Sequence, residues 1–154
     1  MKRLILTLAF FTCSNVLACP QAKTMFNGAV PATIYGLNPF CGEQGQYWVN
    51  AYSRVFRASG AQVNYVETYK AYAASSDEMA KMARSVQTLL NTIDYRYEGS
   101  EDLDDGGAVL TFHKANTTRR HIALILKPMT GFMMFAFINM DMPYEHTWED
   151  QYEH

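Results

Sequence analysis

The segment from Ser75 to Ile93 constrains the fold most, because it has the pattern of a single amphipathic helix. Ser75 and Glu78 have the spacing of a capping box, in which both side chains satisfy free N–H groups at a helix start. Apolar residues then recur at steps of three and four positions. They are Met79, Met82, Ala83, Val86, Leu89, Leu90 and Ile93. We expect a helix over about residues 76–93 with one face buried.

Three strand-like segments in the C-terminal half supply the surface on which this helix packs. They cover residues 108–114, 120–127 and 132–140, with turn-forming residues between them. Short connections make neighbouring strands antiparallel, so the three form a meander. The sequence therefore predicts an α+β domain, with one main amphipathic helix packed on an antiparallel β-meander.

The segments before the helix have weaker patterns. Residues 19–45 are rich in proline and glycine without a sustained period, which indicates an irregular N-terminal arm. Residues 46–58 favour a helix with Trp48 and Tyr52 on one face, and residues 62–72 alternate like a strand. Residues 95–98 favour a short strand, followed by an acidic loop at 101–107.

The first 18 residues have the order of a secretory signal peptide. Lys2 and Arg3 precede a short apolar run, and Val16, Leu17 and Ala18 form a cleavage-site pattern. The run is too short to span a bilayer. We expect a bacterial protein cleaved after Ala18 and located in the periplasm or secreted. The mature chain then consists of a single domain over 19–141 and a tail over 142–154.

Cleavage after Ala18 makes Cys19 the first mature residue and leaves two chemical outcomes open. Residues 16–19 resemble a bacterial lipobox, which implies acylation of Cys19 and a membrane anchor, although Leu17 departs from the small residue usual there. In the alternative, Cys19 and Cys41 are the two cysteines left in an oxidising compartment, and they form a disulfide. We favour the soluble, disulfide-bonded form.

Charge and short motifs exclude several functions. The full chain has a formal net charge of −2, and removing Lys2 and Arg3 makes the mature chain more acidic, so nucleic acid is not an expected partner. The sequence has no P-loop, no Gly-x-Ser-x-Gly and no His-Glu-x-x-His motif. We therefore assign no catalytic residue and no cofactor, and a binding protein is favoured over an enzyme.

Strand alternation divides the expected meander into two faces. One suits the helix and contains Leu110, Phe112, Ile122, Leu124, Leu126, Phe132, Met134, Ala136 and Ile138. The other, also largely apolar, contains Val109, Thr111, His113, His121, Ala123, Ile125, Met133, Phe135 and Phe137. A tight loop at Pro128 would place Ile125 beside Met133 and Ala123 beside Phe135. This second face is covered either by the arm and residues 46–58 or by a partner.

Two groups of residues are candidate metal ligands. His113 and His121 lie at equal distances from Thr117, so a turn centred there places the two imidazoles opposite each other. Five methionines lie between 129 and 142, and thioethers bind soft metals such as Cu(I). Because alternation separates most of these methionines, they are more typical of core packing.

The acidic tail adds a second candidate docking element. Tyr144, Trp148 and Tyr152 recur at four-residue steps and form one stripe on a helix. With Met133, Phe135 and Phe137, they are the residues expected to bind a protein partner or a second copy of the chain.

The leading hypothesis is an exported bacterial envelope protein that works by binding another protein, as an accessory subunit, an inhibitor or an immunity-type protein. The alternatives are a small envelope hydrolase and a periplasmic metal-binding protein that uses His113, His121 and nearby methionines.

Overall fold

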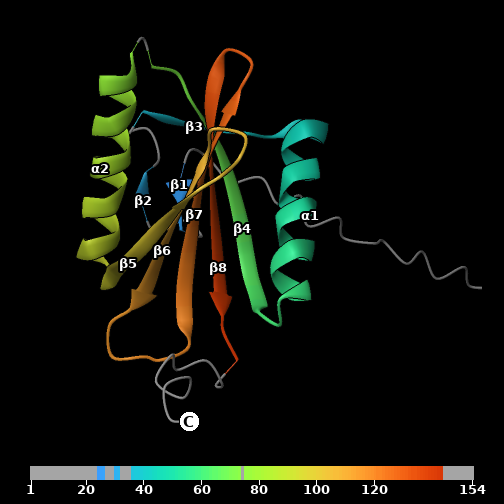
Figure 1. Cartoon of the computed structure of the whole chain (residues 1–154), viewed down its shortest axis with the longest axis vertical. Helices are drawn as coiled ribbons and strands as arrows, with labels where there is room; N and C mark the ends of the chain where they lie inside the picture. Colours follow the sequence, from blue (N-terminus) through green and yellow to red (C-terminus); the bar gives the residue numbers. More distant parts are fainter. Residues whose placement is uncertain (1–23, 27–29, 32–35, 74, 144–154) are drawn as a thin grey trace, which may run out of the picture.

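A six-stranded antiparallel sheet forms the centre of the molecule, with one helix on each side (Figure 1). The computed structural model describes residues 24–26, 30–31, 36–73 and 75–143. The strand order is β3-β4-β8-β7-β6-β5, and every neighbouring pair is antiparallel. The α+β class predicted from the sequence is confirmed.

The elements have well-defined bounds. The helices are α1 (Gly42–Ala58) and α2 (Ser76–Thr92). The sheet strands are β3 (Leu37–Pro39), β4 (Gln62–Ala71), β5 (Tyr95–Asp102), β6 (Ala108–Lys114), β7 (Arg120–Met129) and β8 (Phe132–Asp141). A separate two-stranded pair consists of β1 (Thr24–Met25) and β2 (Val30–Pro31).

Helix α2 matches the predicted helix closely. The Ser75 side chain accepts a hydrogen bond from the Glu78 backbone N–H at 3.2 Å, which is half of the expected capping box. Val86, Leu89 and Leu90 are buried in one core cluster, and Met79 and Met82 pack against that cluster. The apolar stripe of α2 is therefore the face that packs on the sheet.

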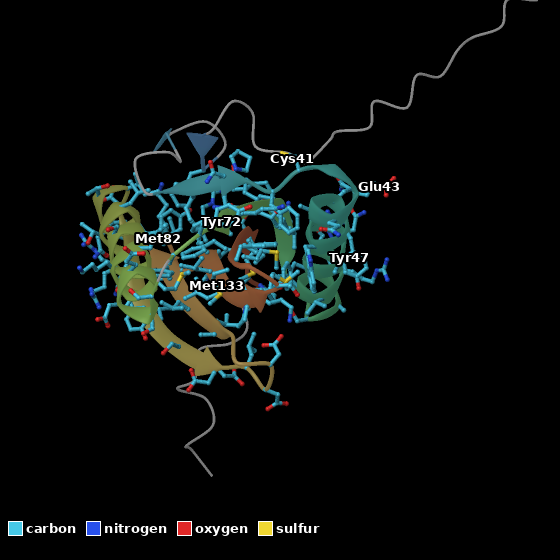
Figure 2. The ribbon with its side chains drawn as sticks, turned by 90° about the horizontal axis from the view of Figure 1, so that it is seen from above. Cys41, Glu43, Tyr47, Tyr72, Met82 and Met133 are labelled. Atoms are coloured by element: carbon cyan, nitrogen blue, oxygen red, sulfur yellow. The ribbon has the colours of Figure 1, made fainter. Side chains whose placement is uncertain are left out.

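Helix α1 lies on the opposite side of the sheet. Figure 2 shows the two helices flanking the sheet, with Met82 on one side and Tyr47 on the other. Helix α1 begins at Gly42, four residues earlier than predicted, and β3 also lies within the stretch expected to be irregular. The stretch 19–45, predicted as an irregular arm, therefore also contains an edge strand and the start of α1. Prolines and glycines obscured an edge strand and the first turn of a helix.

The second face of the meander was partly misassigned. Strands β7 and β8 are joined by Thr130 and Gly131 alone, and Gly131 has a φ of +84° that other residues rarely adopt. In this register Ile125 faces Ala136, and Ala123 faces Ile138. The expected neighbours, Met133 and Phe135, are each three positions away. A shift by an odd number of residues moves every β8 side chain to the other face.

The N-terminal segment packs over the sheet on the α2 side. Phe26 is buried, and its ring contacts that of Phe137 edge to face at 5.1 Å between centroids. The Phe26 backbone N–H donates to Glu67 Oε2 at 2.7 Å. This contact belongs to the core cluster that also contains the buried face of α2.

No helix within the described ranges is long and apolar enough to cross a membrane. The signal peptide, the tail over 142–154 and the exact limits of the domain stay predictions, because residues 1–23 and 144–154 lie outside the described part of the chain.

Candidate functional site

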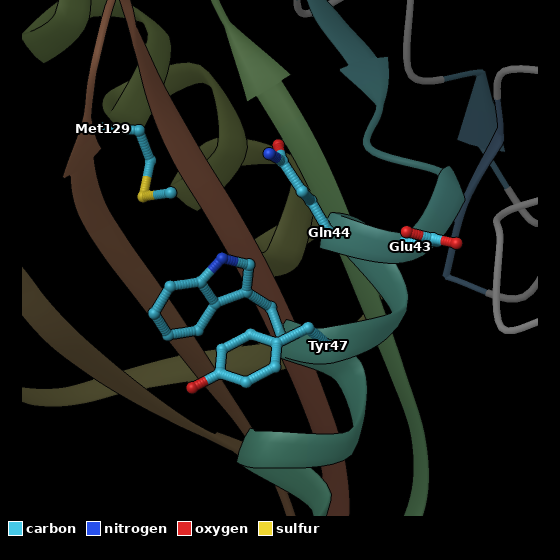
Figure 3. Close-up of a pocket in the computed structure, with 5 residues that line it drawn as sticks. Glu43, Gln44, Tyr47 and Met129 are labelled. Atoms are coloured by element: carbon cyan, nitrogen blue, oxygen red, sulfur yellow. The ribbon is translucent and has the colours of Figure 1, made fainter.

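An open hollow with aromatic walls lies between the start of α1 and the β7–β8 hairpin. Its volume is about 340 Å³, and it is lined by Glu43, Gln44, Tyr47, Trp48 and Met129. Figure 3 shows Met129 on the hairpin side, across from Gln44 and Tyr47 on α1. Glu43 is the charged residue among the five. The hollow therefore combines apolar ring surface with one carboxylate and one amide.

Three aromatic rings of α1 form a contiguous group that we call the aromatic strip: Tyr47, Trp48 and Tyr52. Trp48 and Tyr52 are stacked at 5.6 Å with 27° between their planes, and Tyr47 meets Trp48 edge to face at 5.2 Å. Tyr47 is 64% exposed, whereas Trp48 and Tyr52 are half-buried. Each ring fixes its neighbour, so the strip presents ordered aromatic surface to solvent.

A close backbone contact holds the first turns of α1 in place. A Cβ atom on Gly45 would lie 1.9 Å from the Phe40 carbonyl oxygen, so only glycine allows this approach. Phe40 is itself fixed, because its N–H donates to the Thr68 carbonyl at 2.8 Å and its carbonyl accepts from the Thr68 hydroxyl at 3.1 Å. Gly45 therefore determines where Tyr47 and Trp48 lie relative to the sheet.

The turn between β5 and β6 brings acidic residues to the other side of the strip. Asp105 is bonded to Lys127, whose Nζ lies 5.3 Å from the centre of the Trp48 ring. The hydrogen bond from Lys127, followed by that from the Gly107 N–H, lowers the pKa of Asp105. Burial, together with the Asp105 charge, raises the pKa of Tyr52 to about 12. Asp105 therefore stays ionised and Tyr52 stays protonated at neutral pH.

A second cation lies against aromatic rings beside the hollow. The Lys70 ammonium is 4.4 Å from the centre of the Phe40 ring and 4.8 Å from that of Phe132. Phe132 pairs in register with Met129, which lines the hollow. Ammonium groups thus occupy ring surfaces twice at this end of the molecule, which is the geometry of cation–π attraction.

The predicted histidine pair forms, and a carboxylate joins it. His113 and His121 are direct partners across β6 and β7. Glu98 is the unpaired residue of a β-bulge in β5, and its oxygens lie 3.2 Å from His113 Nδ1 and 3.7 Å from His121 Nε2. In the described part of the chain, no group of three or more histidine, cysteine, aspartate or glutamate side chains is arranged to hold a metal ion.

The buried Glu67 carboxylate on the α2 side connects two parts of the fold. Glu67 Oε2 accepts hydrogen bonds from the Phe26 N–H and, at 3.0 Å, from the Tyr69 hydroxyl. Burial, followed by the charge of Glu67, raises the pKa of Tyr69 above its ordinary value. The network joins the N-terminal segment to β4.

Of the residues predicted to bind a partner, the three that the structure describes lie in or against the core. Phe135 and Phe137 are fully buried in the core cluster on the α2 side, and Met133 packs against that cluster. Phe135 and Phe137 are therefore core residues of the monomer, because the two-residue β7–β8 turn directs them toward α2. Tyr144, Trp148 and Tyr152 lie outside the described residues.

The methionines and cysteines singled out in the sequence do not gather at one site among the described residues. Met134 and Met140 are buried, as expected of methionines that fill a core, while Met129 lines the hollow. Cys41 is at the N-cap position of α1. Cys19 lies outside the described residues, so the Cys19–Cys41 disulfide stays a prediction.

Sequence reasoning missed the hollow, although one signal for it was present. Trp48 and Tyr52 had been placed on one helical face, which leaves the adjacent Tyr47 off that face. A large aromatic residue beside an apolar stripe is a candidate for exposure. The contribution of Met129 from the hairpin had no such signal, because it depends on tertiary packing.

No family model matches this chain, and no curated protein or solved structure matches it.

Proposed function

We propose that this protein is an exported bacterial envelope protein that acts by binding another protein, and that the partner docks at the hollow. The observation that carries the proposal is the ordered, exposed aromatic surface that Tyr47 and Trp48 present beside Met129. Tyrosine, tryptophan and methionine are enriched in protein interfaces. Export rests on the signal-peptide pattern of residues 1–18.

The distribution of polar groups also suits a protein interface. Apolar ring surface occupies the middle of the site, while Glu43, Gln44 and the Asp105–Lys127 pair lie around it. Interfaces commonly have this arrangement of an apolar centre and a polar rim. An accessory subunit, an inhibitor and an immunity-type protein all work through such a surface.

The test compares capture of a partner by the wild-type protein and two variants. Purified, immobilised protein is incubated with an envelope extract of the source organism, and retained proteins are identified and then measured individually. Tyr47→Ala should weaken the affinity for a specific partner by at least roughly tenfold, the loss typical of an interface anchor. Tyr47 is exposed, so the variant should stay folded.

Val55→Ala is the matched control. Val55 is 62% exposed on the same helix but does not line the hollow. It should leave binding within about twofold of wild type, because scattered surface contacts contribute little. A partner retained equally by the wild type and by Tyr47→Ala would contradict the proposed docking site.

A further inference from the structure

We propose that the hollow receives a basic side chain, arginine or lysine, from the partner protein. This inference rests on the proposed function and specifies the chemistry of the docking segment. The cation would lie against the exposed ring of Tyr47, beside the half-buried Trp48, in a hollow that Glu43 also lines.

The first argument is the behaviour of the molecule's own lysines. Lys127 Nζ lies over Trp48, and Lys70 Nζ lies between Phe40 and Phe132, at distances of 4.4 to 5.3 Å from the ring centres. At this end of the fold, aromatic rings thus already contact the ammonium groups of the protein's own lysines. Tyr47 is the strip residue with the largest exposed fraction, at 64%, and it offers the same kind of surface to a cation from outside.

The second argument is charge. Glu43 is exposed and is the charged residue among the five that line the hollow. Beyond Trp48, segment 101–105 contains four carboxylates, and the Lys127 ammonium bonded to Asp105 offsets one of them. Glu43 and these four carboxylates outnumber the two ammonium groups at this end of the molecule, those of Lys70 and Lys127, so a basic side chain that reaches the strip meets an excess of negative charge.

An acidic side chain is the less suitable occupant. The free N–H groups at the start of a helix attract anions, and the hollow includes residues of the first turns of α1. Glu43 lies in that first turn, where its charge opposes a second carboxylate. An anionic segment would also have its charge against aromatic ring faces, which carry negative potential.

The size of the hollow limits what enters it. A volume of about 340 Å³ is at the lower end of the range for small-molecule sites. It suits one long side chain with its immediate backbone and not an extended peptide. The rest of the partner would rest on the surrounding rim.

The test measures binding of a short peptide with a central arginine to the full mature protein. Trp148→Phe removes the other tryptophan, so that fluorescence reports on Trp48. The matched probe is the same peptide with citrulline in place of arginine, which keeps the shape and removes the charge. We expect the arginine peptide to quench Trp48 and to bind roughly tenfold more tightly than the citrulline peptide. Added salt should weaken the interaction.

Glu43→Gln should weaken binding of the arginine peptide several-fold. Asp77→Asn is the matched control, because Asp77 is also an exposed acid in the first turn of a helix, but of α2. Equal affinities for the two peptides, no effect of Glu43→Gln, or no quenching at millimolar peptide would each overturn the inference.

Failure of this inference is distinguishable from failure of the proposed function. A natural partner that is lost with Tyr47→Ala but retained by Glu43→Gln would mean that the site docks a protein through an uncharged group. A natural partner that is unaffected by Tyr47→Ala would reject the docking site and this inference together.

Discussion

The two sides of the sheet use aromatic residues in opposite ways. On the α2 side, the rings of Tyr69, Phe112, Phe135 and Phe137 are fully buried. On the α1 side, the buried sheet residues are smaller and include Ala123, Ile125, Ala136 and Ile138. The helix rings Tyr52 and Phe56 pack against this cluster, whereas Tyr47 of the aromatic strip is exposed.

This difference suggests that one side of the sheet mainly stabilises the fold, while the other has the proposed binding role. Buried aromatic rings contribute large apolar areas to the core, so the α2 side carries much of the stabilisation. Small residues on the sheet let α1 approach, and the Tyr47 ring remains in contact with solvent. The same residue type therefore has a structural role on one side and a proposed binding role on the other.

Phe137→Ala should have the largest effect on stability and tests the α2 side directly. The Phe137 ring contacts those of Phe26 and Tyr69 at centroid distances of 5.1 and 5.7 Å. Truncation would leave a cavity and lower the free energy of unfolding by about 3–5 kcal/mol. Equilibrium denaturation with urea, monitored by circular dichroism, measures this change.

Tyr47→Ala is the counterpart of Phe137→Ala on the α1 side. Because Tyr47 is mostly exposed, its truncation should change the unfolding free energy by less than about 0.5 kcal/mol. If Tyr47→Ala and Phe137→Ala lowered the free energy of unfolding by similar amounts, the two sides would not differ in their contribution to stability as proposed.

Alkaline pH should destabilise the protein chiefly through the α2 side. Burial, followed by the nearby Glu67 charge, raises the pKa of both Tyr65 and Tyr69. A raised folded-state pKa gives a contribution that is complete below the unfolded pKa of about 10 and is lost as the pH rises beyond it. Unfolding experiments from neutral pH upward should therefore show stability falling above about pH 10.

Tyr69→Phe provides the control for the alkaline experiment. It removes one titrating hydroxyl, so stability should fall less steeply with pH, whatever its value at neutral pH. The slope is the informative quantity, because loss of the hydrogen bond to Glu67 lowers stability at every pH. An unchanged slope would mean that Tyr69 does not contribute to the alkaline loss.

Local sequence patterns predicted the helices and strands, whereas tertiary contacts determined how these elements pair and pack. The helix over 76–93 and the strand over 108–114 were recognisable because capping, periodicity and alternation are encoded in neighbouring residues. The partners of β8 were not, because the face of Phe135 depends on whether the loop to β7 has two residues or a different number. The length of this one turn therefore determines that Phe135 lies in the core and not on a docking surface.

The candidate site was less predictable than the fold. His113 and His121 were placed opposite each other correctly, because both strands share one turn. Glu98 joined them only through a β-bulge, which the sequence did not reveal. The hollow needs the close approach of Gly45 to Phe40 and a methionine from a distant hairpin, neither of which has a local pattern.

Glu98→Gln should also have a small effect, and it tests a second time whether the α1 side contributes less to stability. By its register, His113 shares the face of Val109, which packs against the α1-side core cluster. The Glu98 and His113 side chains are 40% and 38% exposed, and ion pairs at such positions contribute about 0–1 kcal/mol. The substitution should therefore lower the free energy of unfolding by less than about 1 kcal/mol.

Urea denaturation of the wild type and Glu98→Gln measures the difference. A loss of several kcal/mol would make Glu98 a structural residue, and the α1 side would then contribute more to stability than proposed.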